Sequence, residues 1–301
     1  MSTPTRKVTL ATLAALRARG EKAVFITAYD YPTATFADRA GADMLLVGDS
    51  AAMTMLGLPN TLGIGLDEML VFARAVSRGA RRAFVIGDLP FLSYQPSDEV
   101  AVRSAGAFVG VGGCDAVKCE GGARVAGRVR AMSDAGIAVM GHLGLTPQSM
   151  AQLGGFKVQG KTLAGAERIV EDALALEEAG AFAILLEAMP AETAALVRER
   201  VNILVYGIGA GPHVDGQLVI SHDILGTFVG DIAPRFVKRY AEVGREIERA
   251  IGEYAADVRA ERFPAPEHCY GTTPEREAEI RGARQPRNPA SFAAAAGTVA
   301  P

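Results

Sequence analysis

The chain has 301 residues, of which 49% are hydrophobic and 22% are charged, and its formal net charge is −3 at pH 7. This composition is typical of a globular protein with a large core and excludes a disordered polymer. The balance of 31 Lys and Arg against 34 Asp and Glu gives no field that would attract nucleic acid or an anionic membrane.

The cysteines and the N-terminal residues indicate in which compartment the protein works. Cys114, Cys119 and Cys269 form no CxxC pair, and an odd number is a poor basis for a disulfide framework, so we expect reduced thiols. The first residues lack the apolar segment of a signal peptide, and no apolar run approaches the roughly 20 residues of a membrane span. We therefore expect a soluble, cytoplasmic protein that binds neither nucleic acid nor membrane.

Short apolar strands alternate with amphipathic helices along the chain. A helix at about Leu10–Ala18, with Thr9 as its N-cap, precedes the first strand. Between the later strands, the helix at about Ala164–Ala179 is the clearest, because its apolar residues recur at helical spacing. Eight apolar segments are predicted as strands: Ala23–Thr27, Asp43–Val47, Phe84–Gly87, Ala116–Cys119, Ile137–Met140, Phe182–Leu186, Ile203–Tyr206 and the weaker Leu218–Ile220.

The alternation of strands and helices predicts a parallel sheet with helical crossovers. Eight such units favour a closed (β/α)₈ TIM barrel over an open doubly wound sheet. We assign residues 1–263 to this catalytic barrel, together with the N-terminal helix and a long helix at about Arg235–Asp257. Beyond residue 263 the apolar periodicity stops and Pro, Gly, Arg and Ala dominate, so we expect residues 264–301 to be an extension that is mobile or contacts a partner.

Acidic residues and one histidine follow five successive predicted strands. One acid after a strand commonly caps the next helix or tightens a turn. Five such residues meet on one face of a barrel, because the C-terminal ends of its strands converge there. Like charges gathered in this way repel unless a cation or a proton lies among them. The five residues are Asp49, Asp88, Glu120, His142 and Glu187.

Carboxylate oxygens without a His or Cys cluster favour Mg²⁺ or a similar ion over zinc. Asp49 and Asp88, on adjacent strands, are the best pair of ligands. Glu120 can join them directly or through water. Glu187, two strands further round, is free to act as a general base.

Other residues of these segments have two interpretations each. Lys118 shares the side of its strand with Glu120, and it either pairs with an acid or reaches solvent. Ser50 contacts substrate or caps the next helix, and His142 donates a hydrogen bond to substrate or is structural. Residues 207–211 are rich in glycine but lack the third glycine of a dinucleotide-binding fingerprint, which argues against a Rossmann fold.

Several segments resemble ketopantoate hydroxymethyltransferase, in the same order from about Val8 to about His268. These segments are Thr27–Asp30, Leu46–Ser50, Asp88–Phe91, Val117–Lys118 with Glu120–Gly122, Gly141–Ser149, Gly154–Gly155, Lys157–Gly160, Gly207–Gly211 and Asp215–Gln217. The resemblance implies a barrel of the phosphoenolpyruvate mutase and isocitrate lyase superfamily type that acts in pantothenate biosynthesis. It also implies a homo-oligomer, with a decamer as the common form.

The same resemblance implies a reaction and a role for each site residue. A hydroxymethyl group passes from 5,10-methylenetetrahydrofolate to 3-methyl-2-oxobutanoate, giving 2-dehydropantoate. One Mg²⁺ per subunit stabilises the enolate that forms when C3 loses a proton. The metal ligands of the family fall on Asp49, Asp88 and Glu120, and the proton acceptor falls on Glu187. The substrate contacts fall on Asp49, Ser50, Asp88 and Lys118, to which we add His142.

The chain departs from the family pattern after its second strand. Ala51 and Ala52 stand where the family usually has Leu-Gly, and residues 57–65 differ from its usual Gly-His-x-x-Thr-Leu-Pro-Val-Thr. This difference leaves open a Mg²⁺-dependent lyase or aldolase that acts next to a 2-oxo acid without folate. A catalytically inactive barrel kept as a binding protein is a further alternative, although intact clustered acids argue against it.

Overall fold

A computed structural model describes residues 6–230 and 234–283 of the chain. It divides the chain into two compact units, residues 1–244 and residues 245–301. The division predicted from the sequence lay after residue 263 and kept the last long helix with the barrel. In the structure nearly all of that helix belongs to the second unit.

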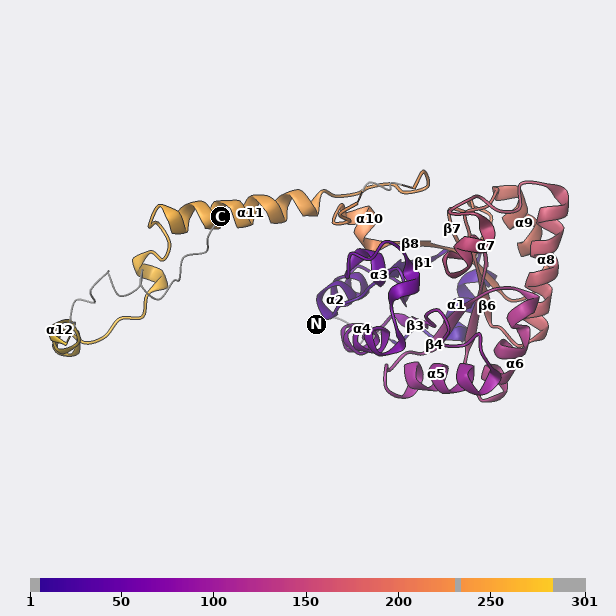
Figure 1. Cartoon of the computed structure of the whole chain (residues 1–301), viewed down its shortest axis with the longest axis horizontal. Helices are drawn as coiled ribbons and strands as arrows, with labels where there is room; N and C mark the ends of the chain where they lie inside the picture. Colours follow the sequence, from indigo (N-terminus) through magenta and orange to yellow (C-terminus); the bar gives the residue numbers. More distant parts are fainter. Residues whose placement is uncertain (1–5, 231–233, 284–301) are drawn as a thin grey trace, which may run out of the picture. The chain divides into compact units, whose positions relative to one another are not determined.

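The first unit is a closed barrel of eight parallel strands in sequential order (Figure 1). The ring closes where Phe25 of the first strand pairs with Leu218 of the last. The predicted fold is therefore confirmed, although several strands end later than predicted. The strands are β1 Ala23–Thr27, β2 Met44–Val47, β3 Phe84–Asp88, β4 Ala116–Glu120, β5 Val139–Gly144, β6 Ala183–Glu187, β7 Leu204–Ile208 and β8 Gly216–Val219.

Helices connect the strands and cover the outside of the barrel. Thr9 caps α1 as predicted, and the same kind of cap recurs at Ser97 before α5 and at Thr162 before α8. The α-helices are α1 Leu10–Ala18, α2 Tyr31–Arg39, α3 Ala51–Thr54, α4 Leu66–Gly79, α5 Asp98–Gly110, α6 Ala126–Asp134, α7 Met150–Leu153, α8 Leu163–Glu178, α9 Ala191–Arg200 and α10 Ser221–Leu225. Short 3₁₀ helices lie at η1 Thr61–Gly63, η2 Ala123–Val125 and η3 Pro147–Ser149.

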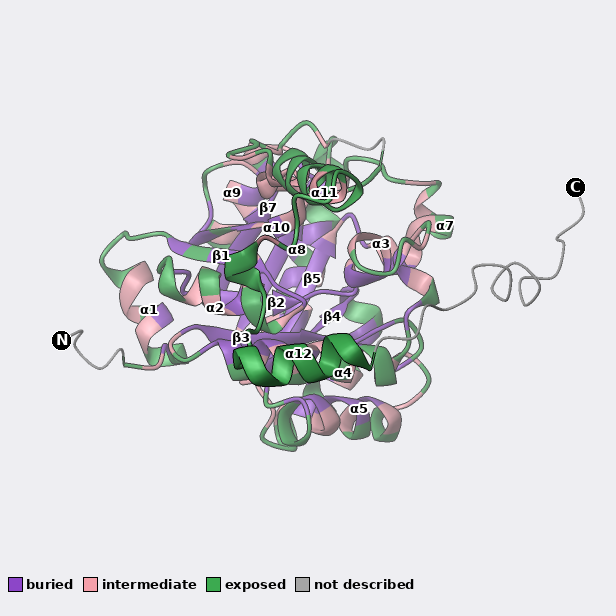
Figure 2. Cartoon of the chain, turned by 90° about the vertical axis from the view of Figure 1, so that its left-hand side faces the viewer, coloured by how far each residue is buried: buried purple, intermediate pink, exposed green. Residues whose placement is uncertain are grey.

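Side chains alternate between two apolar cores along each strand. In β2, Met44 and Leu46 belong to the core inside the barrel, whereas Leu45 and Val47 belong to the core under the helices. Figure 2 shows the buried strands at the centre of this unit. The interior rows of β3 to β6 begin with apolar residues and end with charged or polar ones. Because these polar residues stand at the C-terminal ends of the interior rows, they lie together at one mouth of the barrel.

At the opposite end of the barrel, three aspartates connect neighbouring strands. Each aspartate directly precedes an even-numbered strand. Each carboxylate accepts a hydrogen bond from a backbone N–H of the preceding strand, at 2.8–3.0 Å. Each also forms an ion pair with a basic side chain. The three groups, which we call the aspartate clamps, are Asp43 with Val24 and Arg82, Asp115 with Val85 and Lys7, and Asp215 with Val205 and Arg198.

The second unit contains helix α11, Val243–Arg259, followed by η4, Pro266–His268, and α12, Pro274–Gly282. The predicted start of the long helix at Arg235 is wrong, because backbone N–H groups of Tyr240 and Ala241 hydrogen-bond back to Ile224. Helix α12 was not predicted, although Thr273 at its N-cap and Pro274 at its first position are usual signals of a helix start. Residues 284–301 of the predicted extension lie outside the described residues.

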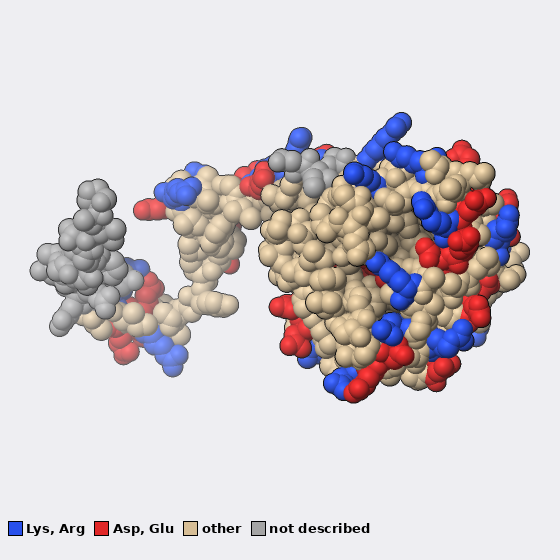
Figure 3. Space-filling view, turned by 45° about the vertical axis from the view of Figure 1, so that its right-hand side comes forward, with Lys and Arg blue, Asp and Glu red and all other residues tan. Residues whose placement is uncertain are grey.

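Two surface properties bear on the expected partners. Within the described ranges, no helix is both long enough and apolar enough to cross a membrane. On the face of the barrel unit shown in Figure 3, acidic and basic side chains are interspersed. That face therefore presents no large basic patch of the kind that binds nucleic acid.

Candidate active site

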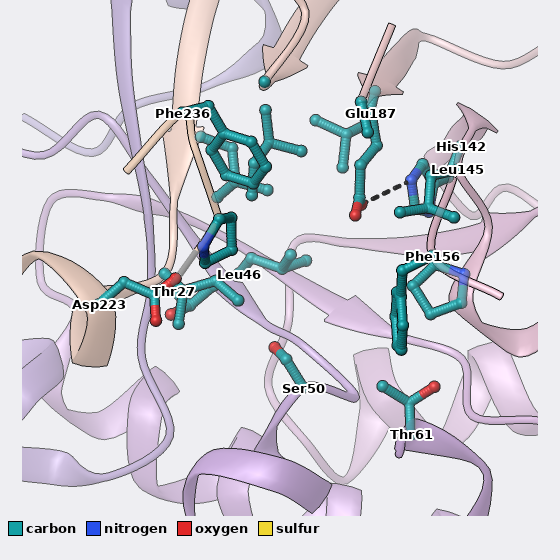
Figure 4. A pocket seen from close by; sticks show the side chains of 18 of the residues that line it. Thr27, Leu46, Ser50, Thr61, His142, Leu145, Phe156, Glu187, Asp223 and Phe236 are labelled. Carbon is teal, nitrogen blue, oxygen red and sulfur yellow. Dashed lines mark ion pairs between the residues drawn. The ribbon is translucent and has the colours of Figure 1, made fainter. Parts of the chain in front are cut away.

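All residues predicted from the sequence to form the site lie around one cavity at the C-terminal ends of the strands. The cavity has a volume of about 780 Å³ and is seen from close by in Figure 4. This is the mouth at which TIM barrels place their chemistry. The predicted residues that line it are Asp49, Ser50, Asp88, Lys118, Glu120, His142 and Glu187.

Asp49 and Asp88 are two buried acids that lie side by side in the site. The backbone N–H of Asp49 donates to Asp88 Oδ2 at 3.1 Å, and both side chains are buried. Burial raises the pKa of Asp49 well above its usual range, and the charges of Asp88 and Glu120 raise it further. Burial also raises the pKa of Asp88, although Lys118 opposes the shift. Lys118 therefore only partly offsets the burial and mutual repulsion of these carboxylates.

Lys118 pairs with an acid and does not reach solvent, which decides between its two interpretations. Its Nζ lies 2.8 Å from Asp88 Oδ1 and 3.3 Å from His142 Nδ1, and its side chain is only 3% exposed. Burial alone would lower the pKa of the amine, but the charges of Asp88, Glu120 and Asp49 raise it above its usual value. Lys118 therefore places a fixed positive charge on the floor of the cavity.

Both carboxylate oxygens of Glu120 already have partners within the protein. Oε2 accepts the backbone N–H of Gln148 at 2.9 Å, and Oε1 lies 3.4 Å from His142 Nδ1. Burial would raise the pKa of this carboxyl, yet the contacts with His142, Lys118 and Gln148 outweigh it and lower the pKa. Glu120 is therefore ionised and less available to a cation than Asp49 or Asp88.

His142 joins Glu120 to Glu187. It lies inside β5, not after it, because the strand continues past the predicted end and pairs Gly144 with Glu187 of β6. His142 Nε2 is 3.1 Å from Glu187 Oε2, and Figure 4 shows the Glu187 carboxylate pointing into the cavity beside it. Burial and Lys118 lower the pKa of His142, but its bonds to Glu120 and Glu187 raise it to about 9 overall. The imidazole therefore forms an ion pair with one oxygen of Glu187.

Gln148 is a site residue that the sequence reasoning missed. Its Nε2 donates to Asp49 Oδ2 and to the Leu89 carbonyl, both at 2.9 Å, and its Oε1 accepts the Tyr94 hydroxyl at 2.9 Å. The side chain thus ties Asp49 to the loop after β3, while its backbone N–H binds Glu120. The only available signal was its place in the segment Gly141–Ser149, which resembles the family.

Ser50 does not cap the helix that follows it. It forms no side-chain capping bond at α3, and its hydroxyl lies 2.8 Å from the Tyr29 hydroxyl. Tyr29 is a second residue that the sequence reasoning missed, and burial raises its pKa to about 12. The neutral phenol therefore orients Ser50 at the edge of the cavity.

The segment that departs from the family pattern forms part of the cavity wall. Ala51 and Ala52 are the first two residues of α3 and are fully buried, while Met53, Thr54 and Thr61 line the cavity. The substitutions at 51 and 52 therefore change the packing behind the wall, and none of the charged site residues lies in this segment.

The acidic residues suit a cation held by two carboxylates better than one held by three. Among the residues that the structure describes, no group of three or more His, Cys, Asp or Glu is arranged to hold a metal ion. Asp49 and Asp88 are close together with Lys118 as their cationic neighbour, whereas Glu120 is bound to His142 and Gln148. Mg²⁺ usually takes one or two protein carboxylates and leaves its other positions to water and substrate. The donor set present fits such a site.

Comparisons with known proteins identify the family of this chain. The sequence model of the family "Ketopantoate hydroxymethyltransferase" matches residues 7–266. The 3-methyl-2-oxobutanoate hydroxymethyltransferase of Syntrophobacter fumaroxidans is 54% identical over 246 residues, which are 82% of this chain and 87% of the relative. The enzyme of the same name from Thermus thermophilus is 50% identical over 253 residues, 84% of this chain and 96% of the relative.

Solved structures support the fold. Phosphonopyruvate hydrolase in complex with oxalate and Mg²⁺ superposes with a TM-score of 0.58 at 14% identity, covering 92% of this chain and 95% of the other. 2,3-Dimethylmalate lyase, a member of the PEP mutase/isocitrate lyase superfamily, gives a TM-score of 0.53 at 18% identity, covering 94% and 95%. At these identities the likeness concerns the fold alone, and it supports the predicted (β/α)₈ barrel.

Proposed function

Since the chain belongs to the ketopantoate hydroxymethyltransferase family, we propose that it transfers a hydroxymethyl group to 3-methyl-2-oxobutanoate and forms 2-dehydropantoate for pantothenate biosynthesis. The observation that carries this proposal is the similarity to relatives named for that transfer, about half identical over more than four fifths of the chain. The same relatives argue against a lyase or aldolase that works without a one-carbon donor. The one-carbon donor that we propose is 5,10-methylenetetrahydrofolate.

Binding of the 2-oxo acid calls for positive charge and hydrogen-bond donors on the cavity floor. Lys118 supplies a fixed positive charge next to Asp88. The hydroxyl of Ser50, held by Tyr29, lines the same cavity and can donate to a substrate oxygen. We therefore assign the carboxylate and keto oxygens of the substrate to the side of the cavity that contains Asp49, Asp88 and Lys118.

Glu187 is the residue that we propose removes the proton from C3. Its Oε2 is held by His142, so its other oxygen is left to accept the proton at the cavity. General-base catalysis requires such a positioned acceptor within hydrogen-bond reach of the substrate. The C3 carbanion then attacks the methylene carbon of the donor, water supplies the hydroxyl oxygen, and tetrahydrofolate leaves.

Asp49 and Asp88 are the residues that would hold Mg²⁺, and Glu120 would contribute through water. The bound cation would supply Lewis-acid stabilisation of the negative charge that develops on the keto oxygen. Support for this assignment comes from the geometry, since both aspartates are buried, line the cavity, and lie close enough for the Asp49 backbone N–H to donate to Asp88 Oδ2 at 3.1 Å. Gln148 keeps the Asp49 carboxylate oriented toward the site.

We also propose that the chain forms a homo-oligomer in the cytoplasm. Four apolar side chains of α11, at Ile247, Ile251, Tyr254 and Val258, lie at helical spacing and are 43–62% exposed. A second copy of the chain would cover this apolar row, and the decamer remains an expectation from the family. The three cysteines are free, as expected for a reducing compartment.

A reconstituted assay tests the function. The protein is incubated with Mg²⁺, 3-methyl-2-oxobutanoate and 5,10-methylenetetrahydrofolate, and 2-dehydropantoate is measured by mass spectrometry. We expect product only when the folate is present. Absence of product with all three components would contradict the transferase, and carbon–carbon bond formation or cleavage without folate would favour the lyase or aldolase.

A further inference from the structure

The cavity is much larger than a small branched 2-oxo acid requires. Its volume of about 780 Å³ lies in the range of pockets that enclose drug-sized ligands. The residues assigned to the cation and the acid occupy only one side of it. The rest of the wall is lined mainly by apolar and aromatic side chains, among them Met53, Phe156, Phe228 and Phe236.

Among the described residues that line this second side, Asp223 is the only acid. It belongs to α10, directly after β8, and Figure 4 shows its carboxylate next to Thr27, across the cavity from Glu187. The residue is half-buried, and burial raises its pKa although the charge of Arg239 opposes the shift. Within residues 6–230 and 234–283, its carboxylate has no hydrogen bond or ion pair. It is therefore available to accept hydrogen bonds from a ligand.

A flat apolar surface adjoins this carboxylate. Phe236 lies over Gly209 so closely that a Cβ added to the glycine would come within 2.5 Å of its ring. The ring is 40% exposed, and Figure 4 shows it on the same side of the cavity as Asp223. Phe228 lines the cavity as well. A planar aromatic ligand can therefore pack on this surface with one polar edge directed at Asp223.

We propose that Asp223 binds the 2-amino-4-oxopyrimidine edge of the folate donor, with Phe236 packed against the pterin. The N3–H and the 2-amino group of the pterin are two parallel donors, which match a carboxylate in the manner of a guanidinium. This assignment rests on the proposed function, because it takes folate as the second substrate. It places the pterin across the cavity from Glu187. Asp223 would then determine which one-carbon carrier the site accepts.

Two cations at the edge of the cavity fit the other end of the same ligand. Lys157 and Arg235 line the cavity and are exposed to solvent. The glutamyl group of folate carries carboxylates, and these would leave the cavity past the two basic residues. The lining thus has an acid for the amino edge, aromatic rings for the flat body and bases for the acidic tail.

Binding of tetrahydrofolate to the full-length protein tests the assignment. The wild type, Asp223→Asn and the control Glu171→Gln, which changes an exposed acid of α8, are titrated by calorimetry with tetrahydrofolate and with its 2-desamino analogue. A carboxylate offers two acceptors to the two donors of the pterin, whereas an asparagine offers one acceptor and one NH₂ donor. We therefore expect the Kd for tetrahydrofolate to rise about 10- to 100-fold in Asp223→Asn. We expect the wild type to prefer tetrahydrofolate over the analogue, and Asp223→Asn to lose that preference.

A second measurement separates this inference from the proposed function. Exchange of the C3 proton of 3-methyl-2-oxobutanoate with D₂O requires no folate, so Asp223→Asn should exchange within twofold of the wild type. Normal exchange also shows that the variant is folded. The inference is overturned if the wild type makes 2-dehydropantoate but Asp223→Asn binds tetrahydrofolate within twofold of the wild type, or if the wild type binds the two ligands equally. Failure of the wild type to make product at all would instead contradict the proposed function.

Discussion

The functional residues of this chain act in connected groups. His142 contacts Glu120 through Nδ1 and Glu187 through Nε2, at 3.4 and 3.1 Å. It thus links a carboxylate deep in the barrel to one that lines the cavity. Gln148 makes a comparable link between Asp49 and the loop after β3.

The first prediction concerns the base. Glu187→Gln keeps the size of the side chain but removes its ability to accept the C3 proton. We expect solvent deuterium exchange at C3, followed by NMR, to fall by about 10²- to 10⁴-fold. Binding of the 2-oxo acid should change only slightly, because the assigned contacts lie at Asp49, Ser50, Asp88 and Lys118. Undiminished exchange in this variant would rule out Glu187 as the base.

The second prediction concerns Gln148 as a positioning residue. Gln148→Ala removes the donor that orients Asp49, so we expect the affinity for Mg²⁺ to fall about 10- to 100-fold. Gln152, on the exposed side of α7, offers the matched control Gln152→Ala. Calorimetric titration with Mg²⁺ measures both. A merely structural role would lower the Tm of Gln148→Ala and leave its Mg²⁺ affinity unchanged.

At the residue scale, charge determined what could be predicted from the sequence. Asp49, Asp88 and Glu187 stood out because carboxylates at successive strand ends repel unless they serve a site. Gln148 and Tyr29 were missed because a neutral amide or phenol in a loop carries no such cost. Their roles depend on hydrogen bonds to residues distant in sequence, such as Asp49 and Ser50.

At the scale of the elements, strand register selects the residues that face the cavity. Phe84, Ile86 and Asp88 share the interior side of β3, since side chains alternate with a period of two. Period and apolar content were visible in the sequence, so most strands were located to within a few residues. The C-terminal ends of β3 to β7 were predicted too early, mainly because charged residues and Gly141–Gly144 were interpreted as loop. Pairing with the neighbouring strands extends β3 to β6 through them.

The third prediction concerns the aspartate clamps. Asp215→Ala leaves the buried N–H of Val205 without its acceptor and removes the ion pair with Arg198. We expect the free energy of unfolding to fall by about 2 kcal/mol, measured by urea denaturation. The kcat of the folded variant should stay within twofold of the wild type, because the clamp lies at the end of the barrel opposite the cavity. A large loss of kcat with unchanged stability would contradict this separation.

At the scale of the whole molecule, the chain consists of a barrel unit and a second unit that begins after residue 244. The barrel was predictable because its repeated strands and helices carry a strong periodic signal. The start of α11 was not, because residues 235–242 have helical character but are held in another conformation by bonds to Ile224. Such tertiary bonds override local propensity.

The fourth prediction concerns assembly. Ile251→Asp places a charge in the exposed apolar row of α11, so we expect the oligomer to dissociate or shrink in light scattering coupled to size exclusion. Glu248→Gln, an exposed change on the same helix, should leave the mass unchanged. A wild type that is monomeric would contradict the proposed homo-oligomer. An unchanged mass of Ile251→Asp would show that this row does not form the interface.

The distribution of the aspartate clamps has a consequence for motion. They fasten β1 to β2, β3 to β4 and β7 to β8, whereas Phe182 holds the equivalent place before β6 and brings no carboxylate. The β5–β6 pair, which carries His142 and Glu187, therefore has no such clamp at that end. Amide protons there should exchange with solvent sooner than those beside the clamps. We therefore expect local opening of the barrel to begin at the end of β5 and β6 that lies opposite His142 and Glu187.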